Sequence, residues 1–124
     1  MAEAEAGKTE QRLGSVRISP HVLSTIVRLT TLSVPGVVRM SHDLSSNVDR
    51  LLKGKTTSEG VRVEVVDDTV SVDVFVIVAN DTNIYELGLQ VQARVARAIK
   101  DMVGMPVLAV NVHVVDVEAA PIAH

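Results

Sequence analysis

Cysteine and tryptophan are absent from this chain of 124 residues, and it contains only one Phe and one Tyr. The lack of cysteine excludes a disulfide scaffold, a thiol nucleophile, an iron–sulfur cluster and a cysteine-ligated zinc site. The shortage of aromatic side chains removes the stacking platforms on which proteins bind single-stranded nucleic acids. Twelve basic residues against fifteen acidic ones give a net charge of −3, which is a second argument against a nucleic-acid partner.

Long hydrophobic runs are also absent, although 47% of the residues are hydrophobic. The uninterrupted apolar runs are only a few residues long, whereas a membrane-spanning helix needs about 20. The first eight residues are acidic and lack the basic and apolar regions of a secretion signal. We therefore expect no membrane span and a cytoplasmic location.

Valine is abundant, with 25 positions in the chain. Its β-branched side chain favours strands, and the length of the chain fits one domain with an aliphatic core. The two ends are less hydrophobic than the rest of the sequence. We expect residues 1–13 to be a disordered tail, residues 14–117 to be a single domain, and residues 118–124 to be a flexible C-terminal tail.

Two helices and a short strand are expected in the first part of the domain. Residues 15–18 alternate and predict a strand, and Ser19-Pro20 supplies the N-cap and first residue of a helix that ends near Ser33. Val34-Pro35-Gly36 stops this helix, and residues 37–40 are extended. In residues 41–53, apolar side chains at helical spacing predict one short amphipathic helix: Leu44, Val48, Leu51 and Leu52. A polar loop follows to Gly60.

A valine-rich hairpin is the clearest expectation. Valine recurs at every second position in residues 61–65 and 70–78, and Asp67-Asp68-Thr69 supplies the turn between them. The opposite face of the second strand begins with polar side chains and ends with Phe75 and Ile77. Because these two are apolar, part of that face must be covered by the chain itself or by a partner.

A long helix and a last strand complete the domain. Asn83 and Glu86 form a capping pair for a helix over residues 84–103, and Gly104 ends it. Residues 107–117 predict a strand with Leu108, Val110, Val112 and Val114 on one face and either a bulge or fraying near Val114, where the alternation changes phase. This strand should lie parallel to the second hairpin strand through a right-handed crossover. The fold class is α+β: a two-layer domain with a mixed sheet, two main helices and one short amphipathic helix.

The sequence offers few candidate catalytic residues. The four histidines have no metal-binding spacing, the Asp67-Asp68 pair fits a turn, and the scattered glycines form no phosphate-binding loop. A small basic cluster around residues 50–55 fits a solvated loop better than a membrane contact. We therefore expect no catalytic, cofactor-binding or metal-binding residues, and no enzyme.

The ordered set of motifs resembles the alkaline shock protein family of bacterial envelope stress response proteins. Residues 16–23 look like the opening segment of that family, and Val34 to Met40 match its V-x-G-V-x-x-M element. The hairpin at 60–65 and 70–78 and the closing strand at 110–114 are also similar. The likeness covers residues 16–117. It departs at Tyr85, where relatives often have Pro, and at residues 79–81, where they have an aromatic residue and glycine.

The resemblance implies a non-enzymatic cytoplasmic protein, peripheral to the inner face of the cell membrane. It implies an envelope-stress scaffold that forms homo-oligomers or binds a membrane-anchored protein. The expected partner surface comprises Phe75, Ile77, Tyr85, Leu44, Val48, Leu51 and Leu52. The alternative is a regulatory protein that binds a lipid-precursor biosynthetic enzyme or an acyl metabolite, which requires a pocket under the segment 43–53.

Overall fold

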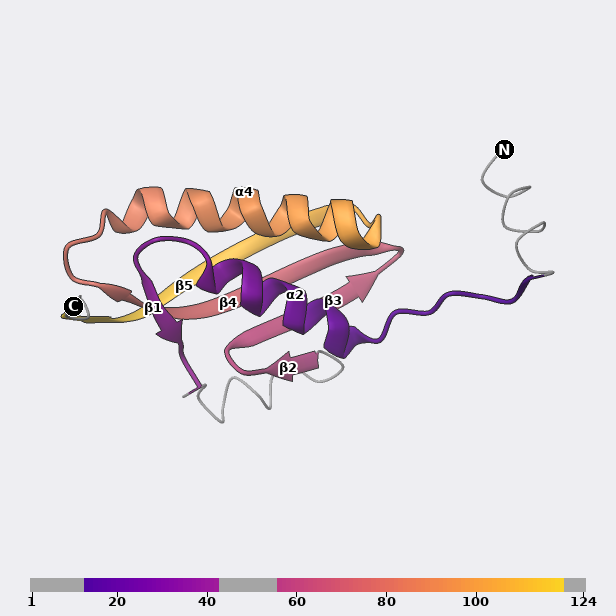
Figure 1. The fold of residues 1–124 in the computed structure, drawn as a ribbon, viewed down its shortest axis with the longest axis horizontal. Helices are drawn as coiled ribbons and strands as arrows, with labels where there is room; N and C mark the ends of the chain where they lie inside the picture. Colours follow the sequence, from indigo (N-terminus) through magenta and orange to yellow (C-terminus); the bar gives the residue numbers. More distant parts are fainter. Residues whose placement is uncertain (1–12, 43–55, 120–124) are drawn as a thin grey trace.

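A computed structural model describes residues 13–42 and 56–119, which form a five-stranded mixed sheet with two helices packed on one face (Figure 1). This arrangement confirms the expected two-layer α+β domain. The elements in chain order are α2 (Pro20–Leu32), β1 (Val37–Met40), β2 (Thr56–Ser58), β3 (Val61–Val66), β4 (Thr69–Ala79), α4 (Ile84–Val103) and β5 (Val107–Glu118).

Strand β4 is the centre of the sheet. Strand β5 runs parallel to it along almost its whole length, from the Val70–Val107 pair to the Ala79–Glu118 pair. Since a strand has only two edges, β3 and β1 share the other edge of β4. Both are antiparallel to β4: β3 lies beside its first half and β1 beside residues 76–78.

The hairpin of β3 and β4 closes at the predicted place through a two-residue turn, Asp67-Asp68, and Thr69, which was expected in the turn, is the first residue of β4. Asp67 and Asp68 both have positive φ angles, 51° and 63°. This is the type I′ geometry, whose twist matches that of the flanking strands. The turn fixes the register, so that Val63 lies opposite Val72 and Val61 opposite Val74. All four of these valines therefore point to the same face of the sheet.

That face carries the core. Every second side chain of β4 has no exposed surface: Val70, Val72, Val74, Val76 and Val78. Buried side chains of α2 and α4 pack against them, among them Leu23, Val27, Leu87, Val91, Val95 and Ile99. Each fully buried Val or Leu contributes about 1.5–3 kcal/mol. The core is aliphatic throughout, in accordance with the composition.

The predicted helix ends are confirmed. The Ser19 hydroxyl accepts a hydrogen bond of 3.0 Å from the backbone N–H of His21, and Pro20 is the first residue of α2. The side-chain oxygen of Asn83 accepts one of 3.0 Å from the N–H of Glu86 at the start of α4. At its other end, α4 stops at Gly104, where the backbone turns left-handed with a φ of 79°.

The last strand contains two register shifts against β4. Val76 pairs with Val114 but Ile77 pairs with Asp116, so the bulge predicted near Val114 is confirmed and Val115 is the extra residue. A second shift leaves Leu108 without a partner in β4. The expectation that Leu108 shares a face with Val110 is therefore wrong: the Leu108 side chain is 74% exposed, whereas that of Val110 is 7% exposed.

Two local expectations in the first half of the chain are also wrong. Residues 15–18 form no strand, and Val16 is 93% exposed, because alternation makes a strand only where a neighbouring strand is available. Conversely, the expected loop before Gly60 contains β2, which pairs antiparallel with β3. The helix predicted over 41–53 lies mostly outside the described residues, as do residues 1–12 and 120–124; Ser41 and His42 are not helical.

Candidate interaction surfaces

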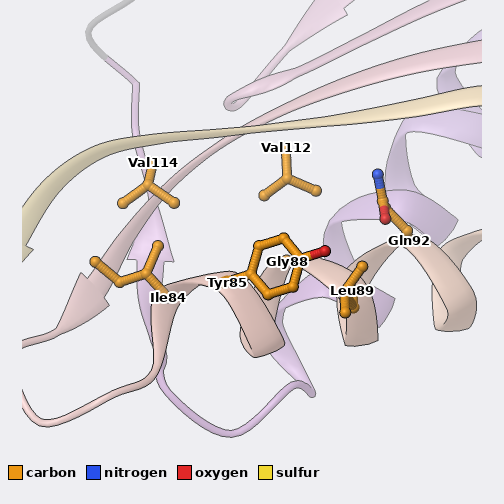
Figure 2. Close-up of a pocket in the computed structure, with 7 residues that line it drawn as sticks. All are labelled: Ile84, Tyr85, Gly88, Leu89, Gln92, Val112 and Val114. Atoms are coloured by element: carbon orange, nitrogen blue, oxygen red, sulfur yellow. The ribbon is translucent and has the colours of Figure 1, made fainter.

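A groove of about 460 Å³ lies between the first half of α4 and β5 (Figure 2). The helix contributes Ile84, Tyr85, Gly88, Leu89 and Gln92, and the strand contributes Val112 and Val114. None of these side chains is charged. We call these seven residues the α4–β5 groove.

Helix α4 forms this groove because it has apolar side chains on two sides. Leu87 and Val91 are buried in the core, whereas Tyr85 and Leu89 are 75% and 48% exposed and line the groove. Gly88 lies between these sides, and a Cβ atom placed there would have no heavy atom within 4 Å. The missing side chain keeps this part of the groove open.

The other wall of the groove is the free edge of the sheet. Within the described ranges, β5 has only β4 as a strand neighbour. The side-chain amide of Gln92 donates a hydrogen bond of 3.1 Å to the carbonyl of Val110, which therefore points away from β4. Since backbone groups alternate in direction along a strand, Val112 and Val114 present their N–H and C=O groups to the same free edge.

The sheet face away from the helices carries an aromatic stack centred on Phe75. The His113 ring of β5 lies 4.4 Å from the Phe75 ring and is almost parallel to it, at 9°. The guanidinium carbon of Arg62, from β3, lies 4.4 Å from the centre of the same ring, a cation–π distance. Arg62 is only 6% exposed, and among the described residues its Nε and Nη1 atoms have no hydrogen-bond partner.

Asp73 connects the two strands beneath this stack. Its Oδ1 atom accepts a hydrogen bond of 3.1 Å from the Asn111 amide and lies 3.0 Å from Nε2 of His113. A carboxylate in this position fixes the orientation of an imidazole ring. The described residues contain no group of three or more side chains able to hold a metal ion. The contacts thus orient the His113 ring against Phe75.

The structure separates the described residues of the predicted partner surface. Tyr85 lines the α4–β5 groove, and Phe75 is half-buried on the opposite face of the sheet. Ile77 pairs with β1 on one side and with β5 on the other and is only 6% exposed, so we correct its assignment to the surface. The other four predicted residues lie outside the described ranges: Leu44, Val48, Leu51 and Leu52.

Leu89 and the free edge of β5 are not among the residues that the sequence predicts for a partner surface. Leu89 lies off the main apolar stripe of its helix, and this single misplaced apolar side chain was the available signal. The free edge has no local signal, since it depends on which strand ends the sheet. No helix in the described part of the chain is long and apolar enough to cross a membrane.

A family model matches residues 8–119: the ASP23 family, described as having a cell envelope-related function. The match spans most of the chain, so the chain belongs to this family of alkaline shock and general stress proteins. The resemblance inferred from the motifs is thereby confirmed.

Curated relatives are distant in sequence but similar in extent. The uncharacterised protein YqhY of Bacillus subtilis (strain 168) is 25% identical over 109 residues, which cover 88% of this chain and 81% of that protein. A stress response regulator gls24 homolog of Streptococcus pyogenes serotype M3 is 26% identical over 106 residues, covering 85% of this chain and 59% of the relative.

Solved structures of MamM CTD variants share the fold. One zinc form has a TM-score of 0.53 at 17% sequence identity, covering 82% of this chain and 87% of the other. At this level of identity the likeness extends to the fold alone.

Proposed function

We propose that this protein is a non-enzymatic scaffold of the envelope stress response, which acts through protein–protein contacts at the cytoplasmic face of the membrane. The observation that carries the proposal is the family match over residues 8–119, with its cell envelope-related description. The relative described as a stress response regulator homolog supports the stress role. The scaffold forms homo-oligomers and binds a membrane-anchored protein.

The physical character of the surface fits such a role. The α4–β5 groove is uncharged and contains Tyr85, Leu89 and Ile84, each at least 41% exposed. Exposed aromatic and aliphatic side chains in a groove supply the apolar contact area that the centres of protein interfaces contain. The unpaired edge of β5 adds backbone groups that another chain can bind.

A photo-crosslinking experiment in the native host tests the proposal. A photoreactive phenylalanine analogue replaces Tyr85 in the full chain, and the matched control carries it at Met102, which is 68% exposed near the other end of the same helix. We expect position 85, and not position 102, to crosslink to a second copy of the chain or to an integral membrane protein during envelope stress. Deletion of the gene should also increase sensitivity to that stress.

Two results would contradict the scaffold. One is a crosslink from position 85 to a soluble lipid-precursor enzyme, which would favour the regulatory alternative. The other is the absence of any crosslink at position 85 together with an unchanged stress response in the deletion strain. The regulatory alternative also predicts an acyl ligand. The pocket that it requires under the segment 43–53 lies outside the described residues, whereas the α4–β5 groove, at about 460 Å³, has a volume in the range of small-molecule sites. Mass spectrometry of the protein purified under native conditions would detect such a ligand.

A further inference from the structure

We infer that the α4–β5 groove is the contact surface of a two-fold dimer, in which the β5 strands of two copies of this chain pair antiparallel. The inference rests on the proposed self-association and names the surface and residues that bring it about. There is space for a further strand beside the free edge of β5, and such a strand would lie about 4.8 Å from β5. Tyr85 and Leu89 of α4 are exposed toward this space (Figure 2).

The edge of β5 lacks the features that normally prevent such pairing. Natural proteins protect a free edge with charged side chains or proline, or with a covering segment. From Val107 to Val115 the sequence contains no charged residue and no proline. Within the described chain, the only protection of this edge is the hydrogen bond from Gln92 to the Val110 carbonyl. The edge beyond it, at Val112 and Val114, is open.

The residues around His113 in β5 can pair antiparallel with the same residues of a second copy. In an antiparallel pair about a two-fold axis, each residue must suit the residue at the mirrored position. With the axis at His113, Val112 of one chain lies opposite Val114 of the other, so the chemistry is the same in both directions. The two valines then exchange N–H···O=C hydrogen bonds across the interface, since both face the free edge. Val112 and Val114 also line the groove, so the partner strand lies under Tyr85 and Leu89.

Charge favours a second copy at this surface over other parts of the molecule. Each chain carries a net charge of −3, so two copies repel one another in general. The groove and residues 107–115 contain no Asp, Glu, Lys or Arg, and the first acidic side chain along β5 is Asp116. Two copies can thus meet at this surface without bringing like charges together.

The available area sets the strength of the dimer. A largely exposed Tyr offers on the order of 150 Å², and with Leu89, Ile84 and the strand edge each chain buries on the order of 500 Å². Stable complexes bury roughly 800 Å² per partner, and weaker ones less. The dimer should therefore be reversible and dependent on concentration, with a dissociation constant in the micromolar range or weaker.

The absence of cysteine makes a direct test simple, because one introduced cysteine is the only thiol. In the dimer the two copies of residue 113 form a non-hydrogen-bonded pair with Cα atoms about 4.5 Å apart, which a disulfide can bridge. The two copies of residue 111 lie four residues apart along the strands, about 14 Å, which it cannot bridge. His113→Cys is the test variant and Asn111→Cys the control. Each variant loses one contact with Asp73, and His113→Cys also loses the ring stack on Phe75.

We expect mild oxidation at high protein concentration to convert His113→Cys to a covalent dimer and to leave Asn111→Cys monomeric. Circular dichroism verifies that both variants are folded. A second pair of variants avoids the sheet altogether: Leu89→Lys adds a charge to the groove, and Met102→Lys adds the same charge to the same helix outside it. By analytical ultracentrifugation, Leu89→Lys should weaken self-association at least tenfold, and Met102→Lys should leave it unchanged.

The outcomes separate this inference from the proposed function. If the native chain self-associates but His113→Cys forms no disulfide, or Leu89→Lys behaves as the native chain, then another surface is used and the inference is overturned while the scaffold stands. If the native chain stays monomeric up to millimolar concentration, the inference is also overturned. A membrane protein crosslinked at position 85 would then show that the groove takes a strand of a different protein.

Discussion

Replacement of Gly60 by alanine should destabilise the fold far more than the same change at Gly104. Both glycines have left-handed backbones, with φ angles of 81° and 79°. They differ in their surroundings. A Cβ atom at Gly60 would lie 2.7 Å from the carbonyl oxygen of Ser41 and 3.1 Å from that of Phe75, whereas at Gly104 it would have nothing within 4 Å.

The crowding at Gly60 involves backbone atoms that cannot move independently. The Gly60 carbonyl accepts a hydrogen bond from the Phe75 N–H, and the Phe75 carbonyl accepts one from the Ser41 N–H, both at 2.8 Å. A left-handed alanine costs about 1–2 kcal/mol, and overpacking adds about 1–3 kcal/mol. We therefore expect the free energy of unfolding to fall by about 1–2 kcal/mol for Gly104→Ala and by about 2–5 kcal/mol for Gly60→Ala.

Urea denaturation followed by far-ultraviolet circular dichroism measures both changes, since the chain lacks Trp as a fluorescent probe. Low protein concentration keeps self-association out of the comparison. The slope of the free energy with urea should be the same for both variants, because they unfold the same surface. Losses that agree within about 0.5 kcal/mol would refute the argument that the Ser41 and Phe75 carbonyls confine residue 60.

Three further variants test the local structure. Asp68→Gly should raise stability by about 0.5 kcal/mol in thermal unfolding, because the type I′ turn holds residue 68 at a φ of 63°, which glycine adopts without strain; a lower melting temperature would contradict this. Asn83→Ala should cost about 1 kcal/mol by removing the cap of α4, whereas the exposed Gln90→Ala should change stability by less than about 0.5 kcal/mol. Gly88→Ala should stabilise α4 by about 1 kcal/mol in urea denaturation but weaken self-association in ultracentrifugation, since its methyl group enters the groove; changes of the same sign in both assays would speak against the dimer.

The elements that the sequence predicts well are those whose signals are local. The hairpin has its alternation and its two-residue turn within residues 61–78, and α4 has its cap at Asn83 and its stop at Gly104. The bulge at Val115 was also visible as a change of phase in the valine pattern. Each of these signals acts over a few residues and needs no distant partner.

The elements that the sequence predicts badly depend on distant pairing. Residues 15–18 carry a local strand signal but have no neighbouring strand, whereas residues 56–58 lack such a signal but pair with β3. Ile77 was assigned to the surface because the alternation of residues in β4 predicts only the sheet face on which its side chain lies. The alternation does not predict that Ile77 pairs with β1 on one side and with β5 on the other. For the same reason the groove could not be predicted: Tyr85 was identified, but its position beside a free edge follows from the order of the strands.

The central position of β4 affects the exchange of its amide hydrogens and the order in which the strands join the sheet. Its edges are occupied by β3 and β1 on one side and by β5 on the other, so its amide hydrogens exchange with solvent only when neighbouring strands separate. The β3–β4 contacts close a short loop, whereas the β4–β5 contacts close a loop that includes all of α4. Loop closure costs less entropy for the shorter loop, so we expect the hairpin to form first and β5 to dock late. On this expectation, the valines of the strand that offers the free edge stay accessible to other chains until folding is complete.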